Sequence, residues 1–128
     1  MTHKSRLAGF ILDCQTDDLD GAARFWGEAL GYAVKAPNDD PADQHYVGLD
    51  SSRDDLIAEV QKVDHASRVH IDIETDDIEA EARRLEALGA KRVAAIRTWL
   101  VMEAPTGQRF CLVGPQNADF ETKANRWP

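Results

Sequence analysis

The stretch TDDLDGAAR at residues 16–24 decides the fold, because it returns as TDDIEAEAR at residues 75–83. Each copy is followed by a Leu-Gly pair, at 30–31 and at 88–89, and each is preceded by a short alternating run with an aspartate at the matching place. These flanking features make coincidence a poor explanation. A block that recurs at this spacing is the mark of a structural repeat. We therefore expect two similar units, each about half of the chain.

The first unit is predicted to contain a strand, a helix and three further strands. Residues 8–14 alternate in hydropathy, which is strand periodicity. Apolar residues at three- and four-residue spacing then predict a helix with a buried stripe of Leu19, Ala22, Ala23, Trp26 and Leu30. Thr16 or Asp17 is expected to cap the start of this helix, and Gly31 to end it in a left-handed conformation. The remaining strands are expected at residues 32–35, 45–49 and 56–62.

The second unit repeats this order. A strand is expected at residues 69–74 and a helix at 77–88, whose buried stripe consists of Ile78, Ala82, Leu85 and Leu88. Further strands are expected at 92–96, 99–103 and 109–113. The tail has no periodicity, and we expect Phe120 and Trp127 to pack it against the body. The predicted organisation is one domain, 1–128, with unit 1 at about 6–63, unit 2 at about 67–114 and a C-terminal tail at 115–128.

Composition limits the partners of this protein. The 128 residues include 15 Lys and Arg against 23 Asp and Glu, for a net charge of −8. This acidic balance argues against nucleic acid, whose binding depends on clustered cations. No apolar run approaches the ~20 residues of a membrane span, and the N-terminus lacks the apolar stretch of a signal peptide. We therefore expect a cytoplasmic protein that binds neither nucleic acid nor membrane.

The two cysteines, Cys14 and Cys111, are too few for a disulfide framework. Both lie within apolar, strand-like runs, which predicts buried and reduced thiols. A catalytic cysteine needs a nearby histidine or a cationic helix start. The sequence shows no such neighbour for either residue.

Several other side chains have a structural interpretation. The acidic pairs at 17–18 and 76–77 are expected at helix starts, where capping and the helix dipole favour them. Phe25 and Trp26 are expected in the core. Of the histidines, we expect His45 and His65 in solvent and His3 in a frayed N-terminus. Two aspartates at matching places, Asp13 and Asp72, leave two interpretations open: ligand binding, or a hydrogen-bonded pair between the units.

These features resemble the vicinal-oxygen-chelate superfamily, which includes glyoxalases, extradiol dioxygenases, epimerases and bleomycin-resistance proteins. The resemblance rests on the paired strand-helix-strand-strand-strand order, on HIDI at 70–73 before DDIE at 76–79, and on MEAPTGQRFCLV at 102–113. This last segment is similar to the family's Asp-Pro-x-Gly-Asn turn and final strand, although Ala104 and Gln108 depart from it. The chain looks closest to the glyoxalase-like domain proteins. The implied fold is α+β, with two βαβββ units forming curved mixed sheets around a shared cavity.

The resemblance also implies where a divalent metal is held in the family, by one residue from the first and the fourth strand of each unit. The matching places provide His70 and Glu59, which are suitable ligand types. The other two places hold Gly9 or Ile11, which cannot bind a metal, and Cys111 where the family usually has glutamate. A full site would need Cys111 as a thiolate, or one of the two matching aspartates as a substitute. The cofactor therefore stays open, and a divalent metal is not favoured.

The strand at 69–74 has two different faces. His70, Asp72 and Glu74 share one face, which should line the cavity. The other face consists of Val69, Ile71 and Ile73, and we expect it to pack on the helix. A histidine beside carboxylates suits general acid/base work near neutral pH.

Our leading hypothesis is a glyoxalase-like protein that binds a small organic molecule and performs a lyase or isomerase step through His70 and Glu59, without the full family metal site. The expected ligand-binding residues are Asp13, Asp72, Gln61, Trp99, Arg109 and Cys111. Two alternatives stay open: a non-catalytic protein that sequesters a drug or metabolite, and a metal-dependent dioxygenase or glyoxalase with an altered ligand set. We also expect a homodimer, because a two-fold partner would cover the apolar strand edges.

Overall fold

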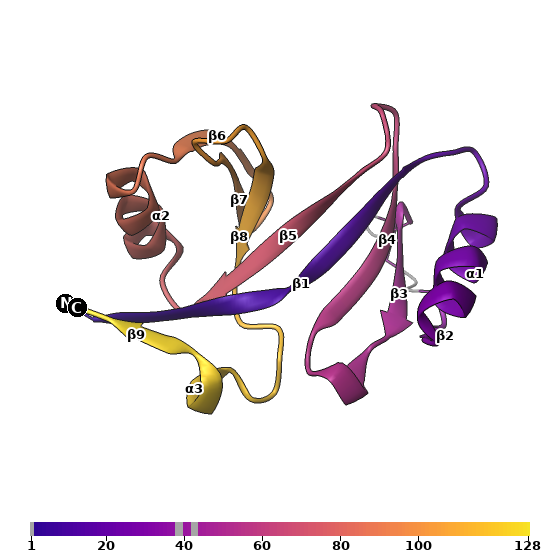
Figure 1. The fold of residues 1–128 in the computed structure, drawn as a ribbon, viewed down its shortest axis with the longest axis horizontal. Coiled ribbons are helices and arrows are strands. Elements are labelled where there is room, and N and C mark those ends of the chain that lie inside the picture. Colours follow the sequence, from indigo (N-terminus) through magenta and orange to yellow (C-terminus); the bar gives the residue numbers. More distant parts are fainter. Residues whose placement is uncertain (1, 38–39, 42–43) are drawn as a thin grey trace. The chain divides into compact units, whose positions relative to one another are not determined.

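The computed structural model describes residues 2–37, 40–41 and 44–128, and it divides into two compact units (Figure 1). One unit, Phe10–Val69, contains the first helix and is here called the α1 unit. The other combines Met1–Gly9 with His70–Pro128 and is called the α2 unit. Among the described residues, no helix has the length and apolar character needed to cross a membrane.

The α1 unit places one helix against a four-stranded sheet. After β1 (His3–Gln15) come α1 (Leu19–Leu30), β2 (Ala33–Val34), β3 (Tyr46–Asp50) and β4 (Ile57–Val63), with a 3-10 turn, η2, at Ser52–Asp54 between β3 and β4. The strand order is β2-β3-β4-β1, and the β2–β3 and β3–β4 pairs are antiparallel. The core between helix and sheet consists of Leu12, Ala23, Leu49, Ala58 and Val60, with Trp26 packed against it.

The α2 unit repeats the pattern with β5 (Arg68–Thr75), α2 (Ile78–Ala87), β6 (Lys91–Ile96), β7 (Trp99–Glu103) and β8 (Arg109–Val113). The order is β5-β8-β7-β6, in which β5 and β8 run parallel and the other pairs antiparallel. Its core consists of Ala82, Met102, Phe110 and Leu112. The predicted α+β class, with two βαβββ repeats and mixed sheets, is confirmed, whereas the cavity shared by the two units stays a prediction.

Both helices start at an aspartate of the repeated motif. Asp18 accepts a hydrogen bond from the Gly21 N–H at 2.9 Å, and Asp77 accepts one from the Ala80 N–H at 3.0 Å. The prediction of Thr16 or Asp17 as the first cap is wrong by one or two residues, because only the residue directly before the first helical turn reaches its free N–H groups. The end of α1 is confirmed, since Gly31 adopts the left-handed conformation with φ 74°.

The tail is more ordered than the sequence indicates. It forms α3 (Phe120–Lys123) and β9 (Asn125–Trp127), and β9 pairs antiparallel with the first residues of β1. The predicted packing of Phe120 and Trp127 is confirmed: Phe120 is buried, and the Trp127 indole donates to Ser5 Oγ at 2.8 Å.

The prediction of a frayed His3 is wrong. Its side chain is only 5% exposed, and its Nε2 lies 2.8 Å from Glu81 Oε1. The reason is that β9 pairs with the first residues of β1, so that His3 lies in a hydrogen-bonded strand and not at a frayed chain end.

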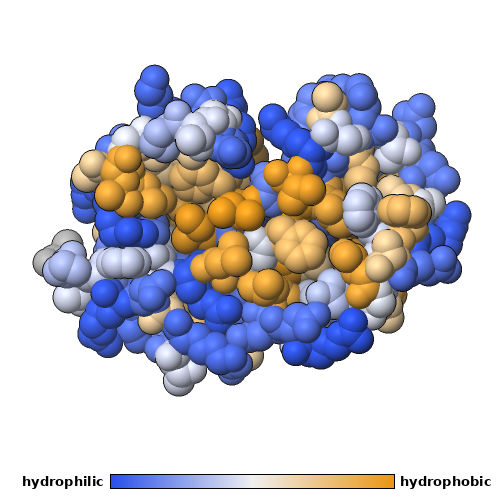
Figure 2. Space-filling model, in the orientation of Figure 1, coloured by the Kyte–Doolittle hydropathy of each residue, from blue (hydrophilic) through white to orange (hydrophobic). Residues whose placement is uncertain are grey.

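Some apolar residues expected inside lie at the surface. Phe25 is 62% exposed and makes a T-shaped contact with the Trp26 ring instead of entering the core. Leu88 is 67% exposed because α2 ends before it, and Leu30 is exposed at the last turn of α1. On β5, Val69 and Ile71 are exposed and only Ile73 packs against the α2 core. Apolar side chains are visible among hydrophilic ones in Figure 2.

Candidate functional site

Three side chains that offer metal-ligand or proton-transfer atoms come together in the α2 unit. His70 and Asp72 are two residues apart on β5, so they project from the same face of the strand. The parallel pairing of β5 with β8 sets Asp72 beside Cys111. One ligand atom from each of His70, Asp72 and Cys111 lies within 4.8 Å of the other two, and all three residues are half-buried.

From the sequence we expected no histidine near either cysteine, and for Cys111 this expectation is wrong. His70 and Cys111 are far apart along the chain, and only the β5–β8 register brings them together. Cys14 differs, because burial raises the pKa of its thiol, although a hydrogen bond with Trp26 opposes this effect. A thiol with a raised pKa stays protonated near neutral pH and is a poor nucleophile. Both cysteines are free thiols, and each is half-buried, so the prediction of buried thiols is wrong.

The spacing in this cluster fits ligands that converge on one point. His70 Nε2 lies 3.6 Å from Asp72 Oδ1, which is longer than a hydrogen bond. Two ligand atoms at ~2.0–2.1 Å from one tetrahedral zinc ion are themselves ~3.3 Å apart. An imidazole nitrogen, a carboxylate oxygen and a thiolate suit a borderline divalent ion and leave a fourth position open. The cluster therefore offers three ligand atoms of suitable type to such an ion, and the spacing of His70 and Asp72 is close to that of two zinc ligands.

Glu59 and Gln61 lie on β4 of the α1 unit. Both are half-buried and share one face of the strand, with Glu59 opposite Gly48 and Gln61 opposite Tyr46. Gln61 Nε2 donates a hydrogen bond to the Tyr46 hydroxyl at 3.0 Å. The joint action of Glu59 and His70 stays a prediction, because the two residues belong to different units.

Asp13, Trp99 and Arg109 have other neighbours. Asp13 is buried on β1, with its Oδ2 3.6 Å from Arg68 Nε. Trp99 begins β7, and the Arg97 guanidinium lies 5.7 Å from the centre of its ring. The β7–β8 register sets Arg109 beside Glu103, and Arg109 Nε donates to Glu103 Oε1 at 3.1 Å. The ligand-binding roles of all three stay predictions.

Sequence reasoning gave no role to Glu74, although alternation had placed it on the face of His70 and Asp72. Its side chain is fully buried. Glu74 Oε1 accepts the backbone N–H groups of Gln116 and Asn117, at 2.6 and 3.0 Å, and Oε2 accepts Asn117 Nδ2 at 2.6 Å. The carboxylate thus anchors the beginning of the tail against the same face of β5 that carries the cluster.

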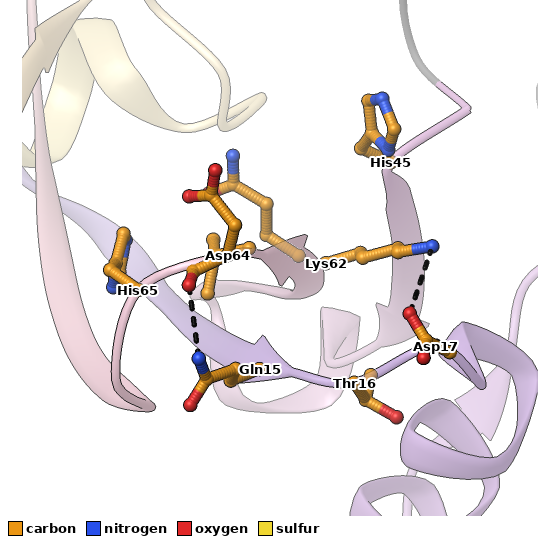
Figure 3. A pocket seen from close by; sticks show the side chains of 9 residues that line it. Gln15, Thr16, Asp17, His45, Lys62, Asp64 and His65 are labelled. Atoms are coloured by element: carbon orange, nitrogen blue, oxygen red, sulfur yellow. Dashed lines mark hydrogen bonds and ion pairs between the residues drawn. The ribbon is translucent and has the colours of Figure 1, made fainter.

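The α1 unit contains an open hollow of about 720 Å³ at the ends of β1, β3 and β4 (Figure 3). It is lined by Gln15, Thr16, Asp17, His45, Gln61, Lys62, Val63, Asp64 and His65. Among these residues, only Gln61 was predicted to bind a ligand. His45 is exposed as expected, but His65 is half-buried and bonds to the Ala66 carbonyl.

Comparison with known proteins agrees with the repeat architecture. The sequence matches the glyoxalase-like domain family over residues 9–113. The chain belongs to this family. The predicted resemblance is thereby confirmed at the level of the glyoxalase, bleomycin-resistance and dioxygenase superfamily. No match was found among curated proteins.

Solved structures share the fold of this glyoxalase-like protein at low identity. Methylmalonyl-CoA epimerase from Mycobacterium tuberculosis superposes with a TM-score of 0.64 at 16% identity, covering 86% of this chain and 87% of that one. The hypothetical protein BH1468 from Bacillus halodurans gives 0.64 at 12%, covering 88% and 95%. A glyoxalase/bleomycin resistance protein/dioxygenase superfamily member from Vibrio splendidus gives 0.51 at 20%, covering 84% and 98%. At these identities the likeness shows the fold alone.

Proposed function

We propose that this glyoxalase-like protein binds a small organic molecule and that His70 transfers a proton on it, in a lyase or isomerase reaction. The observation that carries the proposal is the half-buried imidazole of His70, 3.6 Å from the Asp72 carboxylate and grouped with Cys111. Solved structures with this fold include methylmalonyl-CoA epimerases. We therefore take acyl thioesters with an acidic carbon–hydrogen bond as the first substrate class to test.

Each member of the cluster has a part in this chemistry. Histidine changes its charge between pH 5 and 8, so it both accepts and returns a proton near neutral pH. The charge of the Asp72 carboxylate, 3.6 Å from the ring, stabilises the imidazolium that forms when the proton is taken. We retain Glu59, which was predicted from the sequence, as the second proton-transfer group, and the Glu59→Gln variant tests this role.

A second candidate is a metal-dependent enzyme with an altered ligand set. The grouping of three donor atoms within 4.8 Å favours it. In this case His70, Asp72 and Cys111 would hold a divalent ion, which would supply Lewis-acid polarisation of a substrate oxygen. The thiol, in the place where the superfamily usually has a carboxylate, would then be a ligand.

Deuterium exchange tests the lead proposal directly. Methylmalonyl-CoA and related acyl thioesters are incubated with the protein in D₂O, and mass spectrometry follows deuterium entry at carbon. We expect His70→Gln and Glu59→Gln each to slow the exchange by about 100-fold or more, the usual worth of a general acid or base. Glu121→Gln removes an exposed carboxylate on α3 and should leave the rate unchanged. Exchange that is absent in the wild type, or undiminished in His70→Gln, refutes the proposal for this substrate class.

Two further measurements separate the alternatives. Metal analysis of the wild type, His70→Ala and Cys111→Ser supports the metal-dependent candidate only if the metal content falls in both variants. Thermal-shift assays with the same thioesters and with cationic drugs detect binding, because a ligand stabilises the fold by RT ln(1 + [L]/Kd). Stabilisation without exchange would replace the lead proposal with a sequestering protein.

We also propose that the protein is a cytoplasmic homodimer. Exposed apolar side chains support self-association, among them Val93 and Ile96 on β6, the last strand in the order β5-β8-β7-β6. Apolar groups at a sheet edge gain by being covered, and a two-fold partner is the commonest solution. Sedimentation analysis that finds only monomers would exclude the dimer, and fractionation of the source cells would test the location.

A further inference from the structure

We propose that the hollow at the ends of β1, β3 and β4 is a binding site for a small hydroxylated acid, a molecule with one anionic group and one or more hydroxyl groups. The side chains that carry this inference are Asp17, His45, Lys62, Asp64 and His65 (Figure 3). None of them takes part in the proton transfer proposed above. The two proposals therefore stand or fall separately.

The walls of the hollow are held together by hydrogen bonds between its strand ends. The Lys62 N–H donates to the His45 carbonyl at 2.8 Å, which extends the β3–β4 ladder to the rim. On the other side, Gln15 Nε2 donates to the Asp64 carbonyl at 3.0 Å, and the Gln15 N–H donates to Ser67 Oγ at 3.0 Å. These bonds within the chain fix the positions of the walls, which lowers the ordering cost of binding.

One side of the hollow suits an anion. The Lys62 ammonium lies 4.0 Å from Asp17 Oδ1, and the Asp17 side chain is fully exposed. An ion pair this long and this exposed contributes little, so a ligand can displace it. Figure 3 shows the imidazole of His45 on the same side as the ammonium. Among the residues that the structure describes, no hydrogen-bond partner for this imidazole is found.

The other side offers acceptors, which suit hydroxyl groups. His65 Nδ1 lies 2.8 Å from the Ala66 carbonyl, and a carbonyl only accepts, so Nδ1 carries the proton. In the neutral ring Nε2 is then an acceptor. The Asp64 carboxylate, on the same side in Figure 3, is a second acceptor. Two acceptors disfavour a second anionic group here and favour hydroxyl donors.

The lining agrees with a polar ligand. The hollow measures about 720 Å³, and Val63 is the one apolar residue among the described lining. Pockets for flat or greasy molecules are lined mostly by apolar and aromatic side chains. The chain carries a net charge of −8, so an anion is attracted only where a cation such as Lys62 lies close by.

The test uses D-glycerate and glycerol 3-phosphate, each of which carries one anionic group and hydroxyl groups, with inorganic phosphate and glycerol as separate arms. Calorimetry measures affinity, and ¹H–¹⁵N spectra of the full chain locate the site and show that each variant is folded. We expect saturable shifts at Lys62, His45 and His65, and at least about tenfold weaker binding in Lys62→Gln. Lys91→Gln, which removes an exposed lysine charge on β6, is the matched control and should bind as the wild type does.

The arms divide the remaining outcomes. Binding of D-glycerate shows that a carboxylate serves as the anion, and binding of glycerol 3-phosphate shows that a phosphate does. Asp64→Asn should weaken the hydroxylated acids but should not weaken inorganic phosphate, because only the former use the acceptor side. The inference is overturned if neither acid produces saturable shifts up to about 10 mM, if the shifts map outside the hollow, or if Lys62→Gln binds the tighter-binding acid as well as the wild type does.

Discussion

Replacing Glu81 by glutamine is expected to remove a strongly acid-sensitive contribution to stability. The Glu81 side chain is fully buried. It forms hydrogen bonds with His3 Nε2 at 2.8 Å and with the Nε and Nη2 atoms of Arg84 at 2.7 and 2.8 Å. Burial alone would raise the pKa of Glu81, but hydrogen bonds from Arg84, Ser5 and His3 and the Arg84 charge outweigh it and lower the pKa from 4.5 to about 2. At 1.36 kcal/mol for each pH unit, this difference corresponds to about 3 kcal/mol.

The direction follows from the lowered pKa. The ionised carboxylate stabilises the fold fully above pH 4.5, and this stabilisation is lost as the pH falls towards 2. Urea unfolding followed by tryptophan fluorescence should show Glu81→Gln to be less stable than the wild type by about 3–5 kcal/mol near pH 6, because Arg84 and His3 lose their partner. The gap should narrow by about 2 kcal/mol or more between pH 5 and pH 2.5.

A matched control comes from the tail. Glu121→Gln removes an exposed carboxylate that bonds to Lys4 Nζ at 2.7 Å. An exposed pair contributes at most about 1 kcal/mol, so this variant should follow the wild-type pH profile closely. If the gap between Glu81→Gln and the wild type is the same at pH 6 and pH 2.5, the reasoning about the buried carboxylate is refuted.

Three further variants test local features of the fold. Asp18→Ala should lower the free energy of unfolding by about 1 kcal/mol through loss of the α1 cap, and Asp17→Ala, measured by the same urea titration, should change it by less than half as much. Gly31→Ala should cost about 1 kcal/mol, since an alanine is strained at φ 74°; an unchanged midpoint would contradict the left-handed cap. In a variant that lacks Cys14, Glu74→Gln should speed the alkylation of Cys111 by iodoacetamide several-fold, because the substitution loosens the start of the tail. Equal alkylation rates with and without Glu74→Gln would mean that the tail does not shield the cluster.

The repeat and the helix caps show how far local patterns reach. The two TDD motifs predicted two helices, and the aspartates of these motifs do begin them, at Asp18 and Asp77. Capping, helix periodicity and strand alternation depend on residues within one or two turns, so they can be recognised without the fold. The exact cap was missed, because neighbouring Thr and Asp residues are all good caps.

Errors arose where a residue's surroundings come from distant segments. His3 was predicted to be frayed, yet it is buried because β9, more than a hundred residues later, pairs with it. Phe25 was predicted in the core, yet it is exposed, because the sheet covers only one side of α1. Apolar character alone does not say which side of a helix meets the sheet when large apolar residues are adjacent.

The candidate site was also predicted only in part from the sequence. Alternation placed His70, Asp72 and Glu74 on one face of β5, and the family resemblance pointed to Cys111. Only the parallel β5–β8 register joined Cys111 to that face, and only the path of the tail gave Glu74 its partners. The hollow formed by the ends of β1, β3 and β4 had no signal in the sequence, because its residues lie on three segments with no common motif.

By itself, the sequence determined the duplicated βαβββ order, the approximate positions of the two repeated helices and the polar face of β5, because each is specified by contacts between near neighbours in the chain. The tertiary structure decided which strands pair, which apolar residues are covered and which polar side chains meet. These outcomes depend on strand register and core packing across long separations, and hydropathy period carries no information about either.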